Sequence, residues 1–161
     1  MTVTIIGTLA FDSIKSPYGA HSKLLGGTAC YAGLSSTKFA KTNLISIIGK
    51  DFPQKHIDMF TALDVNIDGI VSSEQDTFHW SGYYEKDMNQ AYTIQTDLNC
   101  LLEFDPIIPD NLKDSRIVFC ANNDPIIQLK SIKQFNSPEL IVLDTMNFWI
   151  ESKIDELRAV I

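Results

Sequence analysis

The chain has 161 residues, of which 45% are hydrophobic and 20% charged, a composition typical of a folded domain and not of a disordered segment. It contains 13 Lys and Arg residues and 20 Asp and Glu residues, and the resulting net charge of −7 disfavours general binding to nucleic acid or to anionic membranes. No apolar run reaches the ~18 residues of a membrane span, and no basic leader opens the chain. Three widely spaced cysteines are not a disulfide framework, so we expect a reducing, cytoplasmic setting.

Apolar runs and helix signals alternate over the first 71 residues. In chain order we expect a strand at 2–7, a short strand at 11–14, a helix from the Gly26-Gly27 pair to Ala40, a strand at 43–48, a helix at 53–63 and an apolar strand at 65–71. This alternation predicts right-handed βαβ units and a mostly parallel sheet.

The middle of the chain, approximately residues 72–97, has a different pattern. Aromatic and small residues occupy alternate positions from Phe78 to Tyr84 and again from Tyr92 to Ile94, with the polar connector 86–90 between them. Period-2 patterning around a loop predicts an antiparallel hairpin. A hairpin inserted into an α/β pattern is typical of a flap, a sheet edge or an oligomer contact.

Strand–helix alternation resumes in the last third. We expect a strand at 116–120, a helix capped by Asp124-Pro125 with Ile126, Leu129 and Ile132 on its buried face, a strand at 140–143 and a final helix capped by Ser152. The amphipathic pattern is still running at Ile161, without a stop signal. Two readings stay open: a frayed terminal helix, or a piece of a longer α/β protein.

Several residues near the expected strand ends could carry chemistry. Asp12 follows the first strand, where α/β sheets bind ligands, and a carboxylate there can accept strong hydrogen bonds from sugar hydroxyls. A solvated turn aspartate is the plainer alternative. Gly26 and Gly27 precede a helix, so a ligand could approach the backbone and free N–H groups there, although a tight turn explains two glycines as well. Neither a dinucleotide fingerprint nor a Walker loop is present.

Further candidates lie on the hairpin and at the two later strand ends. Trp80 could stack on a sugar face or a base, or simply pack on the sheet or on a second subunit. Asn122, with Asn123 and Asp124, ends one strand, and Asp144 and Asn147 follow the next, which points to a shared crevice, with helix capping as the alternative. The histidines and cysteines show no metal-ligand spacing, so we expect no metal site. Cys30 is more typical of a buried thiol than of a nucleophile.

These segments together resemble the ribokinase-like (PfkB) carbohydrate kinase family, which includes ribokinase, fructokinases and nucleoside kinases. The resemblance runs through VTIIGTLAFDSI, LLGGTACYAGL, LISIIGKDFP, FHWSGYYEKDMN, VFCANNDP and LIVLDTMNFWIE. It implies a three-layer α/β/α fold with a mostly parallel sheet and a small antiparallel β lid. Residues 1–161 would be the N-terminal part of one such domain, with the lid at approximately 72–97.

The resemblance also implies an activity: transfer of the γ-phosphoryl group of ATP, with Mg²⁺, to a hydroxymethyl group of a sugar or nucleoside. Asp12 would hold substrate hydroxyls, Gly26 and Gly27 would line the sugar site, and Trp80 would lie on a lid that forms a homodimer contact in many relatives. Asn122 would be a substrate-side residue. Asp144 and Asn147 would lie near the region of phosphoryl transfer.

Two departures from the family pattern shape the prediction. Ribokinase has an asparagine where this chain has Tyr31, and because tyrosine lacks the paired amide contacts, a nucleoside becomes a more natural substrate than free ribose. Family members are also roughly twice as long. Their D-T-x-G-A-G-D type motif, with the anion hole and the general base, has no counterpart in these 161 residues.

We therefore expect the substrate-binding half of an ATP-dependent kinase, with no catalytic residue of its own and no turnover by this chain alone. The alternative is a non-catalytic binding or dimerisation module of the same fold. A Rossmann-like oxidoreductase is disfavoured by the missing glycine fingerprint. If further strands normally follow 140–143, that strand has an unpaired apolar edge, which predicts self-association or a stabilising partner.

Overall fold

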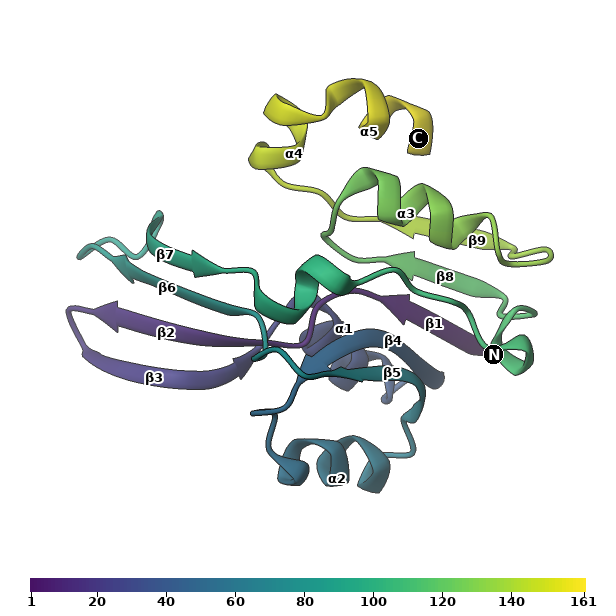
Figure 1. The fold of residues 1–161 in the computed structure, drawn as a ribbon, viewed down its shortest axis with the longest axis horizontal. Coiled ribbons are helices and arrows are strands. Elements are labelled where there is room, and N and C mark those ends of the chain that lie inside the picture. Colours follow the sequence, from purple (N-terminus) through teal and green to yellow (C-terminus); the bar gives the residue numbers. More distant parts are fainter.

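A computed structural model describes all 161 residues, Met1–Ile161. Two sheets form the molecule, and the smaller one extends sideways from the larger one (Figure 1). The larger sheet has five parallel strands in the order β5-β4-β1-β8-β9. These strands are β1 (Thr2–Ile6), β4 (Lys41–Gly49), β5 (Asn66–Ser73), β8 (Ile117–Cys120) and β9 (Leu140–Leu143).

Helices and short 3-10 turns cover both faces of this sheet. They are α1 (Thr28–Ser36), α2 (Gln54–Ala62), η1 (Asn99–Glu103), η2 (Asp110–Leu112), α3 (Pro125–Ile132), α4 (Asn147–Ser152) and α5 (Ile154–Val160). Alternate residues of the strands belong to two separate hydrophobic cores, one on each face of the sheet. Ile5 and Leu44 belong to the core that contains Phe60 of α2, and Ile6 and Ile45 belong to the core on the opposite face. The predicted three-layer arrangement is confirmed.

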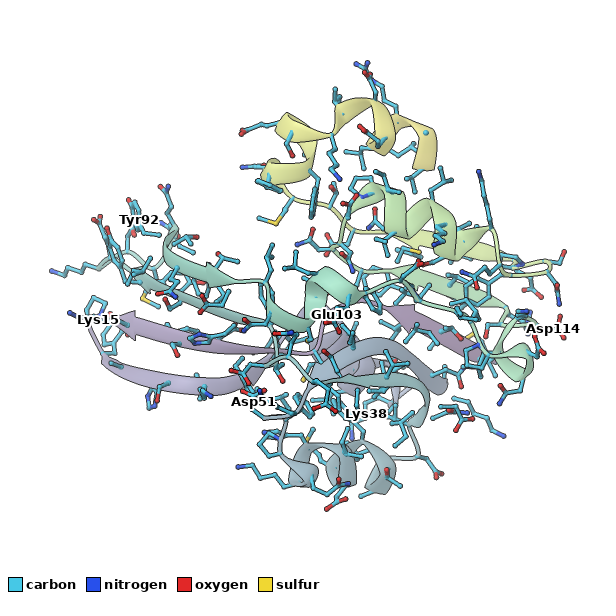
Figure 2. The ribbon with its side chains drawn as sticks, in the orientation of Figure 1. Lys15, Lys38, Asp51, Tyr92, Glu103 and Asp114 are labelled. Carbon is cyan, nitrogen blue, oxygen red and sulfur yellow. The ribbon has the colours of Figure 1, made fainter.

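The smaller sheet has four strands in the order β3-β2-β6-β7. They are β2 (Ala10–Ser16), β3 (Gly19–Gly26), β6 (His79–Tyr84) and β7 (Ala91–Asp97). The expected hairpin is the antiparallel pair β6–β7, but β2 and β6 run parallel, so the sheet is mixed. Strand β3 was not predicted, because its residues are mostly exposed and lack an apolar alternation. Lys15 and Tyr92 lie toward the outer end of this sheet, far from the larger one (Figure 2).

Two details of the last third differ from the prediction. Pro125, Gln128 and Ser131 form the buried side of α3, whereas Ile126 is 49% exposed. The face is polar because the Gln128 side chain donates to backbone carbonyls at the sheet edge. Ser152 caps no helix: it is the last residue of α4, and α5 follows after Lys153 without a side-chain cap.

The outermost strand β9 is apolar and yet exposed. It pairs only with β8, and the exposed fractions of Leu140, Ile141 and Val142 are 52%, 43% and 39%. Helix α5, whose buried residue is Leu157, packs on α3 and leaves this strand exposed. The expected unpaired apolar edge is therefore present. Among the helices, none combines the length and apolar character needed to cross a bilayer.

Candidate functional site

Asp12 and Gly26 meet where the smaller sheet joins the larger one. Asp12 lies on β2 and Gly26 ends β3, and a Cβ atom added to Gly26 would lie 2.0 Å from Asp12 Oδ2. The carboxylate therefore packs directly on the glycine backbone, and a side chain there would displace it. Burial raises the pKa of Asp12, and the nearby His79 lowers it in part. This is a half-buried acidic acceptor and not a freely solvated turn aspartate.

Gly27 forms the N-cap position of α1 and has a φ of 92°, a left-handed conformation that favours glycine. A Cβ there would lie 2.3 Å from the carbonyl oxygen of Thr8. The expectation of free N–H groups at this helix start is wrong for two of them. The N–H of Thr28 donates to Thr8 Oγ1 and that of Ala29 donates to the Thr8 carbonyl. Gly27 thus serves mainly to bring β1 and α1 close together.

Trp80 lies beside Asp12, because the two residues are direct partners in the parallel pair β2–β6. The indole ring lies over Gly82, where a Cβ would come within 2.3 Å of the ring. Its Nε1 donates to Thr93 Oγ1 at 3.1 Å. The ring is therefore held flat along the sheet, partly exposed, on the same face as the Asp12 carboxylate.

Tyr31 lies on α1 and is 62% exposed. Partial burial raises the pKa of its phenol, and the charges of Asp12, Cys30 and Tyr84 raise it further. Tyr31 therefore lies close enough to Asp12 for their charges to interact. Figure 1 shows why: α1 starts at the junction from which β2 and β6 extend.

Asn122, Asn123 and Thr145 mark the carboxyl ends of β8 and β9. Each has a buried polar atom without a protein partner: Asn122 Oδ1, Asn123 Nδ2 and Thr145 Oγ1. Asn122 Nδ2 donates to the sulfur of Met146 at 3.2 Å, which ties the two strand ends together. Because buried polar groups are normally paired, three orphans at one edge indicate a place that binds water or a ligand.

Asp144 is half-buried just after β9, and Asn147 is the exposed first residue of α4. Asp124 has the structural role that the capping alternative gave it. Its Oδ1 accepts from the Ile126 N–H at 3.0 Å, and its Oδ2 accepts from Lys153 Nζ at 2.5 Å. Asp124 is thus committed to α3 and to the C-terminal helices, whereas Asp144 and Asn147 are not engaged in this way.

The cysteine thiols near these residues are shielded by burial. Burial, and then the charge of Asp12, raise the pKa of the Cys30 thiol to about 11, and burial raises that of Cys120 to about 12. Both thiols are buried and free. No three His, Cys, Asp or Glu side chains come together to hold a metal ion.

The two groups of residues lie beyond the same edge of the larger sheet. Strands β1, β8 and β9 are neighbours, and their carboxyl ends face the side from which the smaller sheet extends (Figure 1). Asp12, Gly26, Tyr31 and Trp80 gather on the side of the smaller sheet. Asn122, Asp144 and Asn147 gather at the ends of β8 and β9. Ligands of open α/β sheets bind at such an edge.

The structure resembles solved kinase structures over nearly its whole length. A nucleoside kinase from Methanocaldococcus jannaschii, an archaeal member of the ribokinase family, matches 99% of this chain with a TM-score of 0.75 and 22% identity. Ribokinase from Thermotoga maritima matches 98% with a TM-score of 0.65 and 15% identity. A nucleoside kinase from Burkholderia thailandensis matches 98% with a TM-score of 0.67 and 13% identity.

The chain has a ribokinase-like fold. It spans 57%, 56% and 59% of those three chains, so it corresponds to little more than half of such a molecule. No protein-family model and no curated protein matches the sequence.

Several residues of this candidate site were not singled out from the sequence. Tyr84 was assigned only to the hairpin alternation, Asn123 only to a polar cluster, and Thr145 not at all. The alternation does carry a signal for Tyr84, since it places Tyr84 on the same face of β6 as Trp80. Nothing in the sequence shows that the Asn123 amide nitrogen and the Thr145 hydroxyl are buried without partners.

Proposed function

We propose that this chain is the substrate-binding part of an ATP-dependent sugar or nucleoside kinase. The observation that supports it best is the half-buried Asp12 carboxylate, packed on Gly26 beside Trp80. A carboxylate in partly dry surroundings binds vicinal hydroxyls strongly, and a flat indole next to it suits a sugar face or a base. Tyr31 stands where ribokinase has an asparagine, and because tyrosine lacks the paired amide contacts, we expect a nucleoside to bind in preference to free ribose.

In this proposal the chain binds and orients the phosphoryl acceptor. Asp12 accepts hydrogen bonds from two neighbouring hydroxyls, Trp80 covers the ring, and the unpaired atoms at the ends of β8 and β9 face the far side of the substrate. ATP and Mg²⁺ would supply the transferred phosphoryl group and its charge neutralisation. Their binding groups and the general base are expected outside these 161 residues. We derive no catalytic step for this chain alone.

The test is binding of a substrate panel, measured by calorimetry on the 161-residue chain. We expect adenosine or another nucleoside to bind more tightly than ribose or fructose, and Asp12→Asn to weaken binding at least about tenfold, since it removes a charge-assisted hydrogen bond. Asp58→Asn, on the exposed side of α2, is the control. Binding of simple pentoses alone would overturn the nucleoside preference. ATP-dependent turnover by this chain would overturn its predicted inactivity.

A second role, dimerisation through the smaller sheet, has its own support. Tyr83 and Tyr92 stack with ring centroids 4.9 Å apart near the outer end of the hairpin, and Ile94 on the same strand as Tyr92 is 64% exposed. Apolar groups in this position suit contact with a second copy of the chain. At low protein concentration, where association through other surfaces is limited, we expect a homodimer in light scattering and a monomer for Ile94→Lys. Ile107→Lys, at an exposed position outside the smaller sheet, should leave the mass unchanged.

A further inference from the structure

A bulge in the smaller sheet lies immediately beside Asp12. The pairing of β2 with β3 shifts between Asp12 and Ile14, so that Ser13 faces two residues of β3. Lys23 in this bulge has a φ of 50°, which is costly for a residue other than glycine. Its backbone N–H donates to Ser13 Oγ at 3.2 Å in place of a ladder contact. Bulges of this kind often re-aim a side chain next to a functional site.

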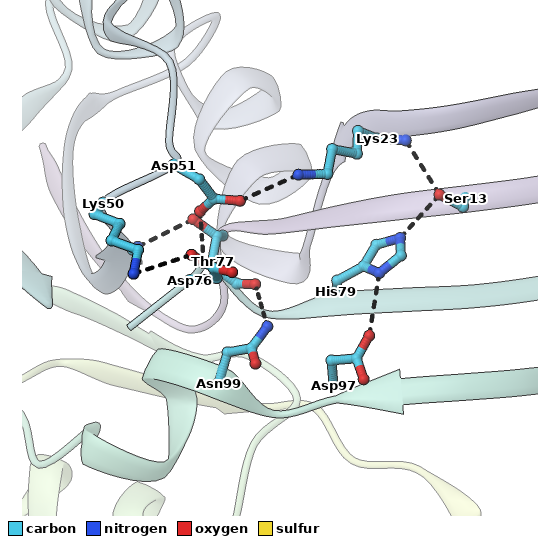
Figure 3. A network of polar contacts seen from close by, with 10 residues as sticks. Ser13, Lys23, Lys50, Asp51, Asp76, Thr77, His79, Asp97 and Asn99 are labelled. Atoms are coloured by element: carbon cyan, nitrogen blue, oxygen red, sulfur yellow. Dashed lines mark hydrogen bonds and ion pairs between the residues drawn. The ribbon is translucent and has the colours of Figure 1, made fainter. Parts of the chain in front are cut away.

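A chain of side-chain contacts runs from the bulge across two further strands (Figure 3). Ser13 Oγ lies 2.8 Å from His79 Nε2, and His79 Nδ1 lies 3.3 Å from Asp97 Oδ2. Gln95 donates to the other Asp97 oxygen at 2.7 Å and, together with His79, lowers the pKa of that carboxyl. Because the Asp97 carboxylate only accepts, Nδ1 donates to it; Nε2 donates to Ser13 Oγ when the ring is protonated and accepts from the Ser13 hydroxyl when it is not.

This contact chain and Asp12 occupy opposite faces of the same short segment. Successive side chains of a strand point to opposite faces, so Ser13 fixes the backbone that carries Asp12 without touching a ligand on the Asp12 side. Lys23 is itself held, since its Nζ lies 3.3 Å from Asp51 Oδ2 and 5.7 Å from the centroid of the Phe11 ring. The contacts of Ser13 therefore anchor this segment from the face opposite Asp12.

We propose that Ser13, His79 and Asp97 are positioning residues that hold the Asp12 carboxylate against Gly26. The proposal rests on the proposed function only in making Asp12 the substrate-facing group. His79 acts in two ways: it holds the bulge through Ser13, and the charge of its protonated ring partly offsets the desolvation of Asp12. The charged and titratable groups arranged around His79 are Asp12 on β2, Lys23 on β3, Asp97 on β7 and, through Lys23, Asp51.

Ser13, His79 and Asp97 contact one another in the same order as the serine, histidine and aspartate of a hydrolytic triad. The surroundings of Ser13 nevertheless favour a positioning role over a nucleophilic one. Ser13 lies within a strand and already accepts the Lys23 N–H, whereas a nucleophilic serine stands exposed on a sharp turn with separate N–H groups for the oxyanion. A locked hydroxyl suits a structural relay.

The experiment is a ¹³C-carboxyl NMR titration of Asp12, assigned with Asp12→Asn, in the full chain. We expect Ser13→Ala, His79→Gln and Asp97→Asn each to raise the titration midpoint of Asp12, because the offsetting imidazole is lost or released. Ser81→Ala is the matched control, since Ser81 pairs with Ser13 in the β2–β6 register. Ser13→Thr keeps a hydroxyl and should restore the wild-type curve.

The outcomes separate this proposal from the proposed function. Titration curves of Ser13→Ala and His79→Gln that superimpose on wild type would overturn the relay, and a shift as large in Ser81→Ala would show that the effect is general loosening. If Ser13→Ala does not fold, His79→Gln and Asp97→Asn carry the same test. The titration needs no ligand, so failure of adenosine and ribose to bind would count against the kinase proposal alone. Where adenosine binds, we expect about a tenfold weaker complex in His79→Gln and none of this loss in Ser81→Ala.

Discussion

Strands β4 and β9 belong to the same parallel sheet and are both rich in Leu, Ile and Val, yet their surroundings are opposite. From Thr42 to Gly49 every residue of β4 is buried, whereas three of the four residues of β9 are exposed. Strand β4 lies between β1 and β5 with a core on each face. Strand β9 is an edge strand that pairs only with β8, and nothing is paired with its other edge.

An apolar sequence therefore indicates that a strand is suited to a buried position. It does not show that these 161 residues bury the strand. A continuous apolar run is typical of a strand that is covered on both faces and on both sides. For β4 the chain supplies that cover. For β9 it does not, which agrees with a chain that spans little more than half of its structural relatives.

Truncating a side chain in each strand should give the largest contrast. Leu44 is fully buried, so Leu44→Ala should lower the free energy of unfolding by about 2–5 kcal/mol through lost contacts and a cavity. Leu140→Ala, at a half-exposed position of β9, should change it by about 0.5 kcal/mol or less. Urea unfolding followed by circular dichroism measures both. Equal losses would mean that β9 is covered in solution.

The open edge of β9 should also drive self-association. Its four residues include no charge and no proline, whereas β5 at the opposite edge carries the exposed Asp68. We expect concentration-dependent oligomers larger than a dimer in sedimentation velocity. Val142→Lys should remove them, because a charge at an edge opposes strand addition.

Val71→Lys on β5 is the matched control, since Val71 is 52% exposed at the other edge of the sheet. It should leave the association unchanged. Ile94→Lys separates any contact through the smaller sheet from contact through β9. A wild-type chain that stays a monodisperse monomer at all concentrations would argue against an open edge.

A smaller effect is expected where the C-terminal helices are attached. Asp124 caps α3 and also binds Lys153, so Asp124→Ala should cost about 0.5–2 kcal/mol of unfolding free energy. Ser152→Ala should cost less, because the Ser152 hydroxyl only donates to a carbonyl within its own exposed helix. Chemical unfolding of both variants would settle which residue the helix end needs. A larger loss in Ser152→Ala would restore the capping role predicted from the sequence.

Most of the fold could be predicted from periodicity, because strands that end at glycine and helices with cap residues leave local signals. Asp12, Gly26 and Trp80 could be assigned to one site only through the resemblance to a known family, because no local pattern links the hairpin that carries Trp80 to the other two residues. Strand β3 was missed because its exposed residues reflect pairing with β2 and not a core. The polar inner side of α3 was missed for a related reason: Gln128 is buried to bind carbonyls that come together only in the folded sheet.

The ionised Asp12 carboxylate should lower the stability of the fold, and the ionised Asp51 carboxylate should raise it. We expect both effects to be smaller than those above. Burial raises the pKa of Asp12, so the folded state binds its proton more tightly than the unfolded state; stability is then lost as the pH rises through the folded pKa. For Asp51, burial raises the pKa, but hydrogen bonds from Thr77 and the charge of Lys23 outweigh it, and the net shift is downward. That contribution is present above the unfolded pKa of about 3.9 and is lost as the pH falls through the folded pKa.

At pH 7, Asp12→Asn should therefore raise the melting temperature and Asp51→Asn should lower it. Near pH 3, where both carboxyls are largely protonated in the unfolded chain, the stabilisation by Asp12→Asn should vanish. The loss from Asp51→Asn should shrink there as well. Thermal unfolding of the two variants and wild type at both pH values measures all four differences. A destabilised Asp12→Asn at pH 7 would mean that the Asp12 carboxylate is needed by the fold itself, and the case for Asp12 as a group held ready for a ligand would weaken accordingly.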